Sequence, residues 1–179
     1  MTSHGDFASY AAMPAQHTPG PEKEPGIRLP LPDEAATGAL GAGLAALVRP
    51  GDFIALSGDL GAGKTALARA LIQARLARHG LEDDVPSPTF TLVQGYETPD
   101  LLLTHVDLYR LDRPEDAAEL GLADALDEGV VLVEWPEKLA ALPADRLDIE
   151  LVLMPEGRRE ARLTGHGVWS ARLAELKGR

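Results

Sequence analysis

The residues of this chain that could do chemistry are concentrated in the segment GDLGAGKT at 58–65. Glycine lacks a Cβ, so the three glycines of this segment let the backbone curl until successive N–H groups point inward and form a concave site for an anion. Lys64 can reach the β- and γ-phosphates of a nucleotide as a point charge, and the Thr65 hydroxyl can ligate Mg²⁺. This spacing is that of the P-loop, and it predicts binding of a nucleoside triphosphate by its phosphates.

Two secondary-structure elements are needed to hold such a loop. Residues 53–56 are all apolar and predict a buried strand before it. Residues from about 65 to 78 are rich in alanine, leucine and arginine, and they predict a helix whose positive dipole end points at the bound phosphates. The sequence therefore predicts strand, loop and helix in the order that the motif requires.

Two acidic residues follow other apolar runs and are candidates for a metal site. Asp107 comes after residues 101–106, and Glu134 comes after residues 130–133. In P-loop proteins a carboxylate at the end of a neighbouring buried strand completes the shell of Mg²⁺. We expect at least one of the two to contact the metal directly or through water, and the residues alone leave open which.

Three further features near these acids have both a functional and a structural interpretation. The hydroxyl-rich segment 87–91, SPTFT, could meet the γ-phosphate or Mg²⁺, or it could form an ordinary proline turn. Trp135 could stack near the site, but on the residues alone packing in the core is favoured. We interpret His105 as a strand residue and not as a base, because a P-loop hydrolase needs a positioned water more than a strong base.

Composition limits the classes of protein to which the chain can belong. Its 179 residues, 45% of them hydrophobic, are enough for one soluble domain with a core. The absence of cysteine excludes disulfides and thiolate zinc sites, and no apolar stretch approaches the ~20 residues of a membrane span. A formal net charge of −11 makes autonomous binding to nucleic acid unfavourable. We expect a cytoplasmic protein.

The order of elements predicts a single α/β domain of the P-loop NTPase type. Its central mixed sheet is expected to have parallel core strands flanked by helices, with antiparallel hairpins at the edges. The hairpins are predicted at 90–108 and 148–164, and further helices at 34–48, after a cap at Asp33, at 115–120 and at 122–128. The domain organisation is predicted as a disordered extension (1–26), a P-loop ATPase domain (27–166) and a C-terminal tail that can form a helix (167–179).

Five motifs together resemble the TsaE family of bacterial ATPases, formerly called YjeE. They are GDLGAGKT at 58–65, SPTFTLV at 87–93, HVDLYRL at 105–111, ELGLADAL at 119–126 and VEWPEK at 133–138. The resemblance extends over about residues 29–163. The combination of SPTFTLV, DLYR and EWP after a P-loop is far more specific than the P-loop alone.

The resemblance implies an ATPase that uses ATP and Mg²⁺ and supports formation of N6-threonylcarbamoyladenosine at position 37 of tRNAs reading codons that begin with A. Its partners would be the proteins TsaB and TsaD, which carry out the chemistry, so tRNA would be contacted only indirectly through the complex. By the family pattern Thr65 and Glu134 would hold Mg²⁺, and Asp107 would support the metal or its water. Lys64, Asp107 and Glu134 would then be the catalytic residues.

The resemblance also implies a set of nucleotide-binding residues. Glu34 and Thr37 would lie against the nucleoside, and Arg159 belongs to a turn that matches a Gly-Arg-Glu element of the family. One departure is Ala66, which stands where a second threonine is common and leaves the metal ligand Thr65 in place. The full set is Glu34, Thr37, Gly58, Asp59, Leu60, Gly61, Ala62, Gly63, Lys64, Thr65, Ala66, Ser87, Thr89, Trp135 and Arg159.

In this interpretation ATP is a switch and not a phosphoryl donor: its binding orders the loop 82–91 and creates a surface for TsaB and TsaD, and hydrolysis resets the complex. Two other classes stay open, a P-loop small-molecule kinase and a nucleotide-dependent scaffold without enzymatic function. Against the kinase, no arginine cluster that could form a lid lies between residues 80 and 101. A GTPase is less favoured than the kinase, because the chain contains no asparagine and so cannot have the guanine-reading motif Asn-Lys-x-Asp.

Overall fold

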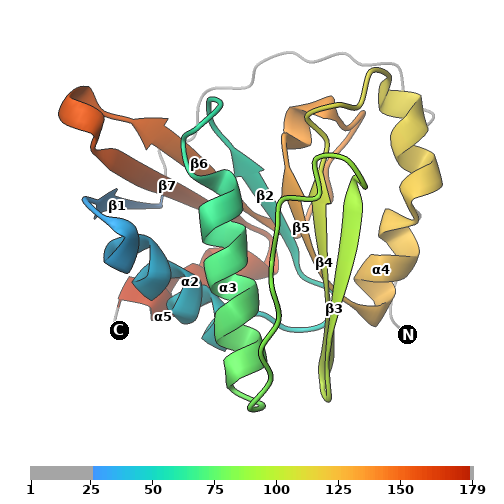
Figure 1. Cartoon of the computed structure of the whole chain (residues 1–179), viewed down its shortest axis with the longest axis horizontal. Coiled ribbons are helices and arrows are strands. Elements are labelled where there is room, and N and C mark those ends of the chain that lie inside the picture. Colours follow the sequence, from blue (N-terminus) through green and yellow to red (C-terminus); the bar gives the residue numbers. More distant parts are fainter. Residues whose placement is uncertain (1–25, 178–179) are drawn as a thin grey trace.

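The computed structural model of the chain describes residues 26–177. Within them a seven-stranded sheet runs in the order β1-β7-β6-β2-β5-β4-β3 (Figure 1). Its strands are β1 (Ile27–Leu31), β2 (Phe53–Ser57), β3 (Val93–Thr98), β4 (Leu101–Asp107), β5 (Gly129–Glu134), β6 (Arg146–Leu153) and β7 (Arg159–His166). The helices are α2 (Glu34–Leu47), α3 (Lys64–Ala77), α4 (Leu122–Glu128), α5 (Val168–Lys177) and the 3₁₀ helices η1 (Pro114–Leu120), η2 (Pro136–Lys138) and η3 (Pro155–Gly157). The disordered extension predicted for 1–26 lies outside the described residues, apart from Gly26.

The central strands of the sheet are parallel. β2 pairs with β5 on one side and with β6 on the other, and β4 pairs with β5. β3 adds antiparallel at one edge, and β7 and β1 add antiparallel at the other. The predicted mixed sheet with parallel core strands and antiparallel edge hairpins is therefore confirmed. Because β2, β5 and β4 are parallel, their carboxyl ends lie along the same edge of the sheet.

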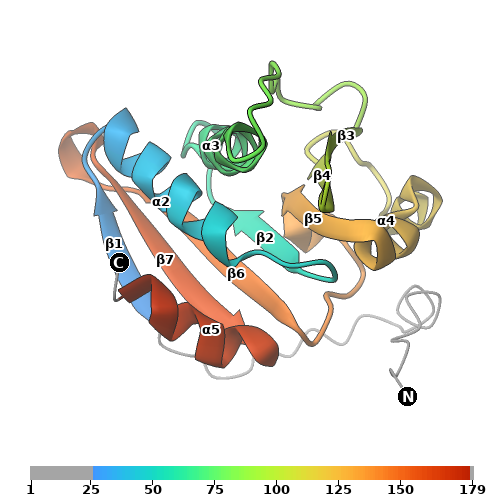
Figure 2. The same ribbon diagram turned by 90° about the horizontal axis from the view of Figure 1, so that it is seen from below.

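Helices cover both faces of this sheet (Figures 1 and 2). Successive strand side chains point to opposite faces, so one set packs against α2, α3 and α5 and the other set against α4. In β2, Ile54 and Leu56 belong to the first core, whereas Phe53 and Ala55 belong to the second. Burial on both faces fixes the position of β2 and of the loop that follows it. No helix of residues 26–177 is both long and apolar enough to span a membrane.

Helix α2 begins at the predicted cap and packs closely on α3. The Asp33 carboxylate accepts a hydrogen bond from the backbone N–H of Ala36 at 2.8 Å. Further along, Gly41 faces α3 so closely that a Cβ there would lie 2.5 Å from the Cβ of Ala70 and 2.7 Å from its carbonyl carbon. A residue without a side chain is therefore what allows the two helices to approach.

Two predicted elements differ from the structure. The strand predicted to begin at Phe90 begins at Val93, because the residues before it form a turn. In that turn the N–H of Leu92, which has φ of 65°, donates to the carbonyl oxygen of Pro88 at 2.6 Å. The helix predicted over 115–120 is instead part of the 3₁₀ helix η1.

The segment 167–179, predicted as a tail, contains α5, and the side chains of this helix belong to the core. Trp169 is fully buried and Leu173 nearly so. Arg172 extends to the start of β2, where it pairs with the buried carboxylate of Asp52. Helix α5 therefore ties the C-terminal segment to the central sheet.

Gly41→Ala is expected to destabilise the protein, because the added methyl group would overlap backbone atoms of α3. We expect the free energy of unfolding to fall by about 2 kcal/mol, within the usual range for overpacking. Gly38→Ala is the matched control in the same helix, since nothing lies within 4 Å of its added Cβ. It should gain up to about 1 kcal/mol from helix propensity. Urea denaturation measures both variants, and equal stabilities would contradict the close approach of α2 and α3.

Candidate functional site

The loop between β2 and α3 has the strongly curved backbone that its glycines allow. Gly58, Gly61 and Gly63 have φ of 129°, 80° and 107°, values that favour glycine over every other residue. At Gly58 the loop also passes so close to β6 that a Cβ would lie 2.2 Å from the carbonyl oxygen of Leu151. The shape of the loop therefore requires these glycines.

Lys64, the first residue of α3, is 4% exposed and lies within the curve of the loop. Its Nζ donates to the carbonyl oxygens of Gly58 at 2.6 Å and Asp59 at 2.9 Å, and it lies 3.9 Å from the ring centroid of Trp135. Burial lowers the pKa of Lys64, and the nearby carboxylates, Glu134 foremost, oppose that shift. A poorly hydrated ammonium group is thus held at the point where the predicted phosphates would bind.

The Thr65 hydroxyl contacts the carboxylate that was predicted to share a metal with it. Its Oγ1 lies 2.9 Å from each of the two carboxylate oxygens of Glu134. The contact follows from the topology, because β5 ends at Glu134 and pairs in parallel with β2, the strand that leads into the loop. Glu134 is 2% exposed, and its Oε1 is also 2.8 Å from Nε2 of His105.

Asp107 ends β4 directly beside the end of β5, where it is the register partner of Glu134. Its Oδ2 accepts hydrogen bonds from the hydroxyls of Ser87 at 2.9 Å and Thr89 at 2.7 Å. Its Oδ1 accepts from the backbone N–H of Tyr109 at 3.0 Å. The carboxylate therefore connects the predicted switch segment to the end of the central sheet.

The oxygen atoms at these strand ends suit a hard cation. Among residues 26–177 no group of three or more His, Asp or Glu side chains is arranged to hold a metal ion. Mg²⁺ needs no such group when a nucleotide supplies phosphate oxygens, because one or two protein oxygens then complete its shell. The hydroxyl of Thr65 and the carboxylates of Glu134 and Asp107 provide that kind of donor set.

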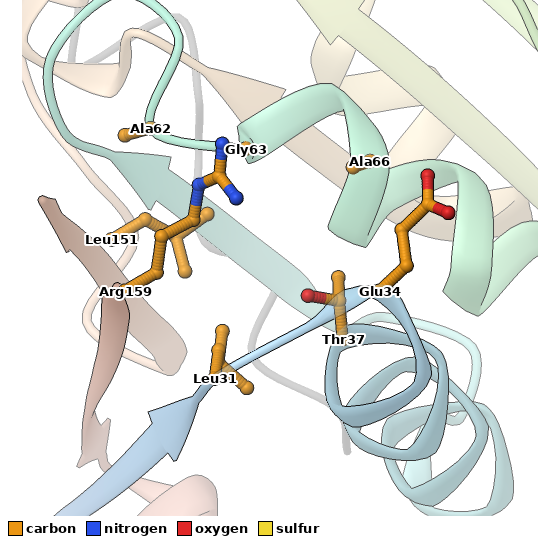
Figure 3. Close-up of a pocket in the computed structure, with 8 residues that line it drawn as sticks. All are labelled: Leu31, Glu34, Thr37, Ala62, Gly63, Ala66, Leu151 and Arg159. Atoms are coloured by element: carbon orange, nitrogen blue, oxygen red, sulfur yellow. The ribbon is translucent and has the colours of Figure 1, made fainter. Parts of the chain in front are cut away.

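A pocket opens on the other side of the loop, between α2, α3 and the start of β7 (Figure 3). Glu34 and Thr37 reach it from the first turn of α2, and Arg159 reaches it from β7. The Arg159 guanidinium lies over the loop, with Nη2 3.4 Å from the carbonyl oxygen of Gly61. The lining residues are Leu31, Glu34, Thr37, Ala62, Gly63, Ala66, Leu151 and Arg159.

The predicted site residues thus fall into two neighbouring groups on either side of the glycine-rich loop 58–65. One group surrounds Lys64 and includes Thr65, Asp107, Glu134, Trp135, Ser87 and Thr89. The other lines the pocket and includes Glu34, Thr37, Ala62, Gly63, Ala66 and Arg159. Leu60 belongs to neither group, since its side chain is 69% exposed on the loop.

The contacts that two residues make at this site were not predicted from the sequence. Tyr109 was not singled out, yet its ring lies 5.2 Å from that of Trp135, centroid to centroid. His105 was interpreted only as a strand residue, yet it contacts Glu134. The spacing of His105 could have indicated this contact. Residues two apart in a strand share a face, so His105 lies on the same face as Asp107, a predicted site residue.

The chain is similar to proteins of known family. The family model "Threonylcarbamoyl adenosine biosynthesis protein TsaE" matches residues 31–161. The tRNA threonylcarbamoyladenosine biosynthesis proteins TsaE of Rickettsia bellii and Bacillus subtilis are 39% and 37% identical to it, over 67% and 69% of this chain and 82% and 75% of their own lengths. The crystal structure of YdiB from Bacillus subtilis matches with a TM-score of 0.69 at 30% identity, over 85% of this chain and 94% of YdiB. The chain belongs to the TsaE family of tRNA threonylcarbamoyladenosine biosynthesis proteins.

Proposed function

We propose that this chain is a Mg²⁺-dependent ATPase that supports formation of N6-threonylcarbamoyladenosine at position 37 of tRNA, together with TsaB and TsaD. The observation that carries the proposal is the contact of Thr65, in the P-loop, with the buried carboxylate of Glu134 on the adjacent parallel strand. In this role the protein works in the cytoplasm.

The geometry supports binding of ATP by its phosphates. The backbone N–H groups of the loop and the start of α3 form a donor-rich, electropositive cradle. Lys64 already occupies this cradle, and phosphate oxygens would replace the carbonyl oxygens of Gly58 and Asp59 as its partners. This exchange favours the anion, because a desolvated ammonium group gains more from a charged acceptor than from a neutral carbonyl.

Thr65, Glu134 and Asp107 would hold Mg²⁺, which neutralises charge on the phosphates during hydrolysis. By donating its proton to Glu134, the Thr65 hydroxyl leaves its oxygen lone pairs available for a cation. The carboxylate of Asp107 is kept in place by the two hydroxyls and one N–H that donate to it. These residues therefore supply oriented oxygens before the nucleotide arrives.

The pocket on the other side of the P-loop is where we infer that the nucleoside lies. Its apolar walls, Leu31 and Leu151, can pack against a purine ring, and Glu34 and Thr37 offer hydrogen-bond acceptors and a donor at its rim. Arg159 lies between this pocket and the loop, where its cation can approach both the nucleoside and the phosphates.

The segment 82–91 is the element through which we infer that ATP controls the partners. Ser87 and Thr89 bond to Asp107, so a change at the metal site changes the anchoring of this segment. Phe90 directly follows Thr89, the second of these anchors, and is 81% exposed, with the guanidinium of Arg110 over its ring at 4.2 Å from the ring centroid. An exposed aromatic ring beside the nucleotide site suits a surface that TsaB and TsaD recognise only in one nucleotide state.

Lys64→Ala and Glu134→Gln are each expected to lower ATP hydrolysis by ~100-fold or more, because each removes a charge from the phosphate or metal site. The measurement is phosphate release by the purified protein with and without TsaB, TsaD and tRNA. Wild type should show weak activity alone and higher activity with the partners. Activity that ignores the partners and needs a small-molecule acceptor would contradict the proposal and favour a kinase.

Binding to TsaB and TsaD is expected to strengthen by at least about tenfold when a non-hydrolysable ATP analogue and Mg²⁺ are present, a typical size for coupling between two sites. Phe90→Ala should weaken this binding, because it removes the exposed ring next to the anchored hydroxyls. Val168→Ala is the matched control, since Val168 is another exposed apolar residue but lies on α5. Calorimetric titration measures these affinities, and an analogue that leaves them unchanged would rule out the switch.

A further inference from the structure

His105 is a fully buried polar residue at the proposed metal site, and the proposed mechanism does not use it. It lies on β4, where Leu103, His105 and Asp107 share one face of the sheet. Its register partner on β5 is Leu132, so Glu134 is the diagonal neighbour, two residues further along the same face. The pleat of two parallel strands therefore aims the imidazole at the Glu134 carboxylate.

The contact defines which imidazole nitrogen carries the proton. Nε2 lies 2.8 Å from Oε1 of Glu134, and an ionised carboxylate only accepts hydrogen bonds, so Nε2 must donate. Nδ1 is buried without a hydrogen-bond partner among residues 26–177. A bare lone pair at Nδ1 is less costly to bury than an unpaired N–H, which agrees with the donated proton lying on Nε2.

The Glu134 carboxylate is thus held by donors from two different elements. Thr65 donates from the first turn of α3, and His105 donates from β4. Without these hydrogen bonds the carboxylate could rotate about the last torsion angle of the side chain. With both hydrogen bonds in place, its oxygens are held toward the P-loop. Thr65 would also bind the metal through its oxygen, whereas His105 makes its hydrogen bond to the carboxylate alone.

We propose that His105 is a positioning residue, whose Nε2–H orients the Glu134 carboxylate for Mg²⁺. The inference rests on the proposed function, because it assigns a metal to Glu134. Its consequence is specific: loss of this hydrogen bond should weaken the binding of Mg²⁺ to the protein–nucleotide complex and leave Mg²⁺-free nucleotide binding unchanged.

Two amide substitutions of His105 distinguish a specific need for the hydrogen bond from Nε2 from a general need for a polar side chain at this buried position. In His105→Gln the side-chain amide nitrogen stands near the position of Nε2, and in His105→Asn it stands near the position of Nδ1. The probe is a fluorescent ADP analogue, titrated with Mg²⁺ in one series and bound in EDTA in the other. We expect His105→Asn to weaken Mg²⁺ binding by about 10- to 100-fold, as for other outer hydrogen bonds of metal ligands, and His105→Gln to stay within about threefold of wild type.

Thr104→Val is the control for damage to β4, because Thr104 is also buried but its side chain points to the opposite face of the sheet. It should bind Mg²⁺ and the analogue like wild type. If His105→Asn binds Mg²⁺ as tightly as wild type, the positioning role is wrong. The role is also wrong if both amide variants lose Mg²⁺ binding together with binding of the ADP analogue in EDTA. If wild type itself shows no Mg²⁺-dependent binding, the proposed function fails first and the inference fails with it.

A second measurement decides the question if His105→Asn does not fold. The ¹⁵N shifts of the His105 ring in wild type report which nitrogen carries the proton. We expect the Nε2–H form. A ring protonated only at Nδ1 could not donate to Glu134 and would overturn the proposal.

Discussion

The parallel pairing of β2 with β5 is the constraint on which the site depends. β2 leads directly into the glycine-rich loop 58–65, and β5 ends at Glu134, so this pairing brings a buried carboxylate to the first turn of α3. β4 adds on the far side of β5 in the same direction and places Asp107 beside Glu134. Three strand ends and one helix start therefore converge, although the residues involved are far apart in the chain.

The charged groups at this point balance one another within the protein. Lys64 is held by carbonyl oxygens and an aromatic face, Glu134 by a hydroxyl and an imidazole, and Asp107 by two hydroxyls and a backbone N–H. Buried charges without such partners would destabilise the fold. In the proposed function, nucleotide binding would exchange these partners and would not have to create the site. Asp107 would also connect this exchange to the segment that carries Phe90, because the hydroxyls of Ser87 and Thr89 donate to its carboxylate.

Local patterns predicted the parts of the fold that local interactions determine. The spacing of glycines with Lys64 and Thr65 predicted the loop, and the apolar runs before Asp107 and Glu134 predicted buried strands of a mixed sheet. The start of β3 was predicted three residues early, because the apolar and hydroxyl residues around Phe90 favour a strand. In the structure these residues form a turn, which is held by the tertiary contacts of Ser87 and Thr89 with Asp107. Propensity carries no information on such contacts.

Other features could not be predicted because they depend on which strands are neighbours. The contact of His105 with Glu134 requires the register of β4 on β5, which no single segment encodes. Likewise, the burial of Trp169 depends on α5 docking beside α2, although the helical character of its segment was readable. The pocket next to the loop 58–65 combines residues of this loop with residues of β1, α2, α3, β6 and β7, and only the resemblance to a family pointed to Glu34, Thr37 and Arg159.

The most direct measurement is a crystal structure of the protein with Mg²⁺ and a non-hydrolysable ATP analogue. We expect the triphosphate to lie against the N–H groups of residues 58–65. Nζ of Lys64 should have left the carbonyl oxygens of Gly58 and Asp59 for phosphate oxygens, and the ion should bind Oγ1 of Thr65 beside Glu134. A triphosphate bound elsewhere, or a metal ion that contacts neither Thr65 nor Glu134, would contradict this expectation.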